Sequence, residues 1–315
     1  MKTPSTLVEA VRVFADRDVA HDFFVKLRWP NGIACPRMGC GSADVRYVKT
    51  RRVWFCRDCE RQFTAKVGTI FEDSPIGFDK WLPAIWMVTN DRNGISSCEL
   101  ARALGVTQKT AWFILHRARL GMSSDTYERL TGSVEADETY VGGKQRHPKP
   151  GRTGTTAKGP AAGKTTVMGM IERGGKVRAF VVRDNKKTTL LPHVFAHVAP
   201  GSTVYTDSLQ SYRDLRESYR HFVINHAKEY VRDHHVHTNS IENFWSVLKR
   251  TIAGTYIAPR PWHLDRYLDE QIFRFNARES KDGPRFCEAA KGADGKRITY
   301  RELIAANPKK ASSAS

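Results

Sequence analysis

The chain has 315 residues, 40% of them hydrophobic and 10% aromatic, which is enough apolar material to exclude bulk disorder. Its 51 Lys and Arg against 33 Asp and Glu give a formal net charge of +18, which favours a polyanionic partner such as nucleic acid over a generically basic surface. The sequence contains neither a run of about 18 uncharged apolar residues nor an apolar secretory signal, so we expect no membrane span and a cytoplasmic location.

Four of the six cysteines follow a metal-ligand pattern. Four residues separate Cys35 from Cys40, and two residues separate Cys56 from Cys59. Two tight turns that each offer two thiolates predict one structural Zn²⁺ with a closed coordination shell; reduced or redox-active cysteines are the alternative. Between the pairs, the β-branched and aromatic residues at 45–48 and 52–55 predict two short strands, so this region is expected to be a zinc ribbon.

A helical region follows the ribbon. An apolar face predicts a helix over 78–90, and Ser96 with Glu99 three residues later predicts the cap of a second helix. Gly105 and a further cap at Thr107 then lead into a basic helix. This order is typical of a helix-turn-helix, with a plain helical hairpin as the alternative. In a helix-turn-helix we expect DNA contacts from the third helix, at Gln108, Lys109, Thr110 and Arg117.

From Gly132 onward the pattern changes to alternating strands and helices. Residues 144–164 hold six Lys or Arg, no acid and many Gly and Pro, which indicates a basic loop with DNA-contacting Lys144 and Arg146, or else a solvated linker. The order of elements predicts an α/β fold with a mixed sheet and flanking helices. We expect strands at 133–141, 165–171, 177–183, 202–207 and 222–224, and helices at 188–198, 209–218, 238–251 and 264–276.

Three acids lie on or beside these elements. Asp137 lies on the first strand, Asp207 ends the fourth, and Glu242 lies on the helix after the fifth. Carboxylates are the ligands that Mg²⁺ prefers, and pairs of such ions serve phosphodiester chemistry. Together, the three acids predict a site for two Mg²⁺ ions, with Mn²⁺ as a substitute.

Three sequence blocks carry a resemblance: DETYVGGK at 137–144, YTD at 205–207 and HTNSIENFWSVLKR at 237–250. With the four-cysteine ribbon before them, they resemble the DDE transposases of bacterial insertion sequences that have an N-terminal zinc ribbon and an RNase H-like core. The resemblance covers roughly residues 15 to 280. It implies binding of double-stranded DNA at element ends and target, Mg²⁺-dependent strand cleavage and transfer, and a homodimer or larger assembly on the bacterial nucleoid.

Carried over residue by residue, the resemblance makes Asp137, Asp207 and Glu242 the catalytic triad and Lys249, beside Arg250, a phosphate-binding residue. Some members are described as using Asn as the third residue, and Asn239 lies one helical turn before Glu242. We favour Glu242, because a carboxylate neutralises Mg²⁺ better than an amide does. Two neighbouring acids have other expectations: Glu135 shares the strand face of Asp137, and Glu138 faces the other way. The histidines 234, 235 and 237 fit a solvated run better than a metal site.

The predicted division has four parts: residues 1–70 with the ribbon, 71–130 with the helix-turn-helix, a catalytic domain over 131–285, and a tail over 286–315. Two other functions stay open at this point. One is a non-catalytic zinc-ribbon and helix-turn-helix regulator; the other is an RNase H-like nuclease that only hydrolyses. The complete set of three acids favours the transposase over the regulator, and the two DNA-reading modules favour it over the nuclease.

Overall fold

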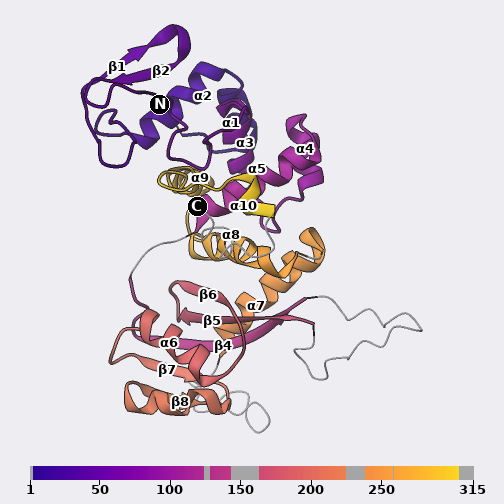
Figure 1. Cartoon of the computed structure of the whole chain (residues 1–315). Coiled ribbons are helices and arrows are strands. Elements are labelled where there is room, and N and C mark those ends of the chain that lie inside the picture. The colour runs from indigo at the N-terminus through magenta and orange to yellow at the C-terminus, as the bar shows by residue number, and fades with distance from the viewer. Residues whose placement is uncertain (1–2, 124–127, 143–162, 225–237, 258, 305–315) are drawn as a thin grey trace, which may run out of the picture. The chain divides into compact units, whose positions relative to one another are not determined.

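A computed structural model describes residues 3–123, 128–142, 163–224, 238–257 and 259–304 (Figure 1). The chain forms two compact units: Met1–Ser123 together with Ala277–Ser315, and Ser124–Asn276 between them. Each unit is described by itself. In the parts of the chain listed above, no helix combines the length and apolarity that a membrane crossing needs.

The first unit is built on an aromatic helical core. The helices of this core are α1 (Leu7–Phe14), α2 (Arg17–Arg28), α3 (Phe78–Asn90) and α9 (Asp282–Lys291). The short α10 (Tyr300–Ile304) follows α9 near the C-terminus. Phe286 of α9 packs against Phe14, Phe23 and Trp86, with ring centroids 5.3–5.9 Å apart. Part of the expected C-terminal tail therefore belongs to this core. The predicted four-part division stays an interpretation of the sequence.

Polar contacts also hold the C-terminal segment in the first unit. Arg28 Nη2 lies 2.8 Å from Asp294 Oδ1. The backbone N–H of Ile70 donates to the carbonyl of Ala293 at 3.0 Å, and that of Gly295 donates to Gly68 at 2.9 Å. These contacts join residues more than 200 positions apart in the sequence.

The ribbon forms as its residue pattern predicts. β1 (Val45–Val48) pairs antiparallel with β2 (Val53–Cys56) through the short turn η1 (Lys49–Arg51), and β3 (Gln62–Phe63) adds a third strand. Trp54 is buried at the centre of the ribbon, where it stacks on His21 and Phe63 and meets Trp29 edge to face.

The next two helices begin at the predicted caps, and the first of them ends before the predicted Gly105. Ser96 and Glu99 form a reciprocal capping box at the start of α4 (Ser97–Leu104), and the Thr107 side chain caps α5 (Gln108–Met122). Between them Gly105 adopts a φ of 61°, a left-handed conformation that suits glycine. Two helices joined by a three-residue turn are thus confirmed, and their role as a DNA-reading motif stays a prediction.

The second unit contains the predicted mixed sheet. Its strands are β4 (Ser133–Val141), β5 (Thr165–Glu172), β6 (Val177–Val182), β7 (Thr203–Thr206) and β8 (Arg220–Val223), in the order β6-β5-β4-β7-β8. β5 is antiparallel to both β4 and β6, whereas β4, β7 and β8 run parallel. A three-strand meander continued by parallel strands is the arrangement expected of an RNase H-like core, so the fold class is confirmed.

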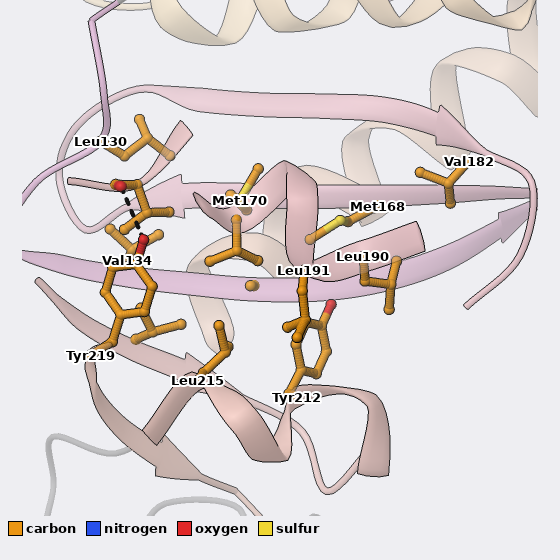
Figure 2. Close-up of a cluster of buried hydrophobic side chains, with 14 residues drawn as sticks. Leu130, Val134, Met168, Met170, Val182, Leu190, Leu191, Tyr212, Leu215 and Tyr219 are labelled. Carbon is orange, nitrogen blue, oxygen red and sulfur yellow. Dashed lines mark hydrogen bonds between the residues drawn. The ribbon is translucent and has the colours of Figure 1, made fainter. Parts of the chain in front are cut away.

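Helices cover both faces of this sheet. On one face, α6 (Lys187–His197) and the 3₁₀ segment η2 (Gln210–Glu217) close a cluster of buried apolar side chains, where the Tyr219 hydroxyl also donates to the Val198 carbonyl (Figure 2). On the other face lie α7 (Asn239–Thr251) and α8 (Leu264–Asn276), joined by η3 (Ile252–Tyr256) and η4 (Pro261–His263). η2 occupies the place of the α-helix expected at 209–218.

Candidate active site

Strand β4 presents acids to both faces of the sheet. Glu135 and Asp137 point toward α7, whereas Glu138 points to the opposite face, as side-chain alternation along a strand requires. There the Tyr212 hydroxyl donates to the Glu138 carboxyl. Burial, followed by the charges of Asp137 and Asp207, raises the pKa of Glu138 to about 9. Glu138 is therefore a protonated packing group at neutral pH, in agreement with its predicted orientation.

Asp137 is the acid at the centre of the site. Burial, followed by the negative charges of Asp207 and Glu242, raises its pKa to about 6 against the lowering effect of hydrogen bonds. One such bond comes from α7, where Trp245 Nε1 donates to Asp137 Oδ2 at 3.0 Å. Asp207 and Glu242 thus act electrostatically on Asp137, although they lie 70 and 105 residues after it in the sequence.

The sheet register explains how Asp207 reaches Asp137. In the parallel pair β4 and β7, Ala136 lies opposite Thr206, so the next residue on each strand is one of the two acids. Asp207 follows β7 directly and is half-buried. Its Oδ1 accepts a hydrogen bond of 3.0 Å from the Leu209 N–H, which holds the carboxylate at the start of the following turn.

Helix α7 supplies the third acid. Glu242 is exposed in the first turn, and Thr238 Oγ1 donates to its Oε1 at 3.3 Å. Asn239 is the first residue of the helix and is also exposed. The charge of Glu242 contributes to the raised pKa of Asp137, whereas a neutral amide at 239 has no such effect.

The chemistry of this donor set fits a divalent cation. The charges of Asp207 and Glu242 disfavour the ionised form of Asp137, and a hard cation with oxygen ligands, such as Mg²⁺ or Mn²⁺, would offset this repulsion. Among the residues that the structure describes, the donor oxygens of the three acids do not lie close enough together to form a preformed metal site. The group of side chains whose donor atoms do lie that close is a set of four cysteines.

Those cysteines are Cys35, Cys40, Cys56 and Cys59, whose sulfur atoms all lie within 4.8 Å of one another. Two of the distances are 3.8 Å, from Cys35 to Cys59, and 3.6 Å, from Cys40 to Cys56. Bonds of about 2.3 Å from zinc to sulfur require an edge of about 3.8 Å in a tetrahedron. Backbone hydrogen bonds, chiefly from the Cys59 N–H, lower the pKa of Cys56 to about 7. The four thiols therefore fit a structural zinc ribbon.

The predicted DNA contacts at the start of α5 lie in accessible positions. Gln108 and Lys109 are exposed and Thr110 is partly exposed. Gln108 Nε2 donates to Ser97 Oγ at 2.7 Å, and Lys109 Nζ lies 4.8 Å from the centroid of the Tyr300 ring. In α7, Lys249 and Arg250 are exposed in the last turn, with Lys249 two turns after Glu242.

Arg117 requires a correction. The sequence predicts a DNA contact at Arg117, but this residue is only 3% exposed. Its guanidinium donates to the carbonyls of Ile70, Glu72 and Ile298 at 2.7–3.1 Å. The same group lies 4.3 Å from the centroid of the Phe113 ring. Arg117 therefore joins three segments of the first unit and has no surface with which to contact DNA.

Some predicted residues lie outside the described part of the chain. These are Lys144 and Arg146 in the basic loop and the histidines 234, 235 and 237.

Two residues that contact the acids were not assigned this role from the sequence. Trp245 belongs to the third sequence block but has no role of its own there, and Gly169 is not singled out. A Cβ on Gly169 would lie 2.4 and 2.5 Å from ring atoms of Trp245, so the glycine leaves room for the indole that binds Asp137. A glycine inside a strand is the signal that was available, since it marks a close approach by another group.

Family comparisons agree with this architecture. Residues 129–276 match the ISXO2-like transposase domain, and residues 16–62 match the transposase zinc-ribbon domain. An uncharacterized protein in transposable element ISH50 of Halobacterium salinarum is 28% identical over 256 residues, which cover 77% of this chain and 85% of the relative. An uncharacterized transposase-like protein of Haemophilus influenzae is 39% identical over 107 residues, or 34% of this chain and 85% of the relative.

The similarity to solved structures is lower. The structure titled mariner Mos1 paired end complex with Mg is 12% identical with a TM-score of 0.27, over 70% of this chain and 80% of the other. The Mos1 Strand Transfer Complex is 13% identical with a TM-score of 0.26, over 69% and 79% of the two chains.

Proposed function

Since the chain belongs to the family of ISXO2-like transposases with a zinc ribbon, we propose that it is the transposase of an insertion sequence. It binds the ends of the element, cleaves DNA strands and joins them to a target with Mg²⁺. The observation that carries the proposal is that acids from β4, β7 and α7 come together at Asp137: burial, followed by the charges of Asp207 and Glu242, raises the pKa of Asp137 to about 6. Clustered carboxylates with perturbed pKa values are typical of functional sites.

In this mechanism Asp137, Asp207 and Glu242 hold the catalytic metal ions. When bound, two Mg²⁺ ions activate the attacking water or 3′-hydroxyl and stabilise the leaving oxygen. The indole of Trp245 fixes one oxygen of Asp137, which orients the carboxylate before metal and DNA bind. Lys249 binds a DNA phosphate next to the site, as a flexible ammonium can.

The first unit binds DNA and brings the enzyme to the element ends. Exposed Gln108, Lys109 and Thr110 contact the element end, and the four cysteines hold one Zn²⁺ that keeps the ribbon folded. Four thiolates leave no open position for water, so this zinc has no part in the chemistry. The active form is a homodimer or larger assembly, because transposition pairs two ends.

Joining of DNA tests the proposal. An oligonucleotide that carries the terminal repeat flanking the gene is incubated with a supercoiled plasmid, Mg²⁺ and the protein. We expect covalent joining of the oligonucleotide to the plasmid. Hydrolysis without joining would identify a nuclease, and binding without either reaction would identify a regulator.

A further inference from the structure

Glu135 is a completely buried carboxylate next to the acid site. It lies two residues before Asp137 on the same face of β4, and its exposed fraction is 0%. A charged group in this environment is costly unless it is paired and hydrogen-bonded. Arg173 Nε donates to its Oε1 at 2.8 Å, and the backbone N–H groups of Ser240 and Ile241 donate to its Oε2 at 2.9 and 3.0 Å.

The two backbone donors belong to the first turn of α7. The first N–H groups of a helix lack partners within the helix, and a side chain at the N-cap commonly supplies them. Here the N-cap residue Thr238 makes no such bond. Glu135 supplies the acceptor from a strand more than 100 residues earlier, and its negative charge also suits the positive end of the helix dipole.

Glu135 therefore fixes α7 against β4 at the end of the helix that carries Glu242. A second contact lies further along the helix, where Trp245 donates to Asp137. The two contacts join neighbouring positions on one strand, 135 and 137, to positions 240–245 on one helix. A change at the first contact would shift Glu242 relative to Asp137 and Asp207.

We propose that Glu135 is a positioning residue: its carboxylate caps α7 and thereby holds Glu242 where it can share metal ions with Asp137 and Asp207. We assign Glu135 to positioning rather than to metal binding, because it is completely buried and its Oε2 already accepts from two N–H groups of α7 while its Oε1 accepts from Arg173. The inference rests on the proposed function, and it concerns the geometry of the metal site rather than the DNA chemistry.

The opposed donors make Glu135→Gln an informative change. If the amide oxygen of glutamine faces the helix, its NH₂ meets the Arg173 guanidinium; if the oxygen faces Arg173, the NH₂ meets the helix N–H groups. Either rotamer sets donor against donor. Replacing Arg173 by leucine removes one side of this conflict, so glutamine can then turn its oxygen toward α7.

The experiment compares Glu135→Gln, Arg173→Leu, their double variant and the control Glu172→Gln. Glu172 lies on β5, and the one described hydrogen bond to its carboxylate is that from Thr131 at 3.3 Å, so the control makes the same charge change outside the α7 contact. Two readouts are used in the full-length protein. Hydrogen exchange reports the Ser240 and Ile241 amides without metal, and the Mg²⁺ concentration for half-maximal thermal stabilisation and cleavage reports the metal site.

We expect Glu135→Gln to accelerate exchange at both amides and to raise the half-saturating Mg²⁺ concentration at least about tenfold, the usual effect of disturbing groups that orient metal ligands. The double variant recovers toward wild type, and Glu172→Gln matches wild type. Faster exchange with an unchanged half-saturating Mg²⁺ concentration, even with lowered thermal stability, would reduce Glu135 to a structural cap and overturn the proposal. Unchanged exchange would overturn the cap itself.

The two proposals fail in different ways. If wild-type protein binds Mg²⁺ but joins no DNA, the proposed function fails while the metal-binding comparison still tests Glu135. If wild type joins DNA and Glu135→Gln shows the wild-type Mg²⁺ dependence, only the positioning role fails.

Discussion

Trp245 on α7 donates its indole N–H to Asp137 on β4 at 3.0 Å, across the space that a glycine leaves on the neighbouring strand. That glycine is Gly169, the direct partner of Asp137 in the β4–β5 register. A helix, a central strand and its neighbour thus meet at one carboxylate.

Gly169→Ala tests this relationship. The new Cβ would lie 2.4 Å from the indole ring, so Trp245 must move away from Asp137. We expect DNA cleavage to fall at least about tenfold and the free energy of unfolding to fall by about 1–3 kcal/mol. The matched control is Gly254→Ala, where no atom lies within 4 Å of the added Cβ. Equal activity of both variants would show that the indole contact is dispensable.

Asp137→Asn should stabilise the metal-free protein while it abolishes cleavage. The pKa of Asp137 rises from 3.8 to about 6 on folding, so the folded state binds the proton more tightly than the unfolded state. The contribution of this group to stability therefore falls as the pH rises from about 4 to about 6, and the full penalty applies above that.

At pH 7.5 the asparagine removes this penalty, which is worth up to about 3 kcal/mol. Urea unfolding in EDTA at pH 4 and pH 7.5 measures the difference, with Asp214→Asn as the control outside the site. Added Mg²⁺ should stabilise wild type but not Asp137→Asn. A variant that is less stable than wild type at pH 7.5 would contradict the account.

Arg117 and Lys109 lie on the same helix and should respond differently. Arg117→Ala leaves three buried carbonyls without their donor and should lower the free energy of unfolding of the first unit by about 3 kcal/mol. Lys109→Ala should keep the stability and reduce the salt dependence of DNA binding by about one released counterion. Thermal unfolding and DNA titrations at several salt concentrations separate the two effects. Weaker DNA binding by a fully stable Arg117→Ala would restore a DNA-contacting role for Arg117.

Cys56→Ser should remove the zinc and unfold the ribbon. Metal analysis is expected to find one Zn²⁺ per wild-type chain and none in the variant, since three thiolates and a hydroxyl hold the ion far more weakly. The control is Cys98→Ser, because Cys98 is exposed and stands outside the four-cysteine group. Full zinc content in Cys56→Ser would contradict the predicted ligand set.

The sequence predicts the helices and strands of this chain better than it predicts the contacts between them. The expected strands at 133–141, 165–171 and 177–183 correspond to β4, β5 and β6, because the signals that predict a strand lie within the element itself. The spacing of the four cysteines is also a signal that lies within one short segment of the sequence. The three acids, in contrast, are indicated only by their places on separate elements, and the family resemblance is what makes them a catalytic triad.

What the sequence does not reveal depends on contacts between distant residues. The charge of Arg117 suggests an exposed position, yet its acceptors are backbone carbonyls up to 181 residues away, which no side-chain pattern encodes. Phe286 gains its aromatic partners only when α9 packs on α1, α2 and α3. Glu135 similarly caps a helix that begins more than 100 residues later.

The central claim is that Asp137, Asp207 and Glu242 together hold the metal ions that cut and join DNA. Mg²⁺-dependent joining of an end-bearing oligonucleotide to a plasmid tests it most directly, with wild type, Asp137→Ala, Asp207→Ala, Glu242→Ala and Asn239→Ala compared at equal DNA occupancy. The account predicts that wild type joins the DNA, that the three acid variants bind the oligonucleotide without cleaving or joining it, and that Asn239→Ala retains joining. Normal joining by Glu242→Ala together with none by Asn239→Ala would contradict the assignment of the third acid.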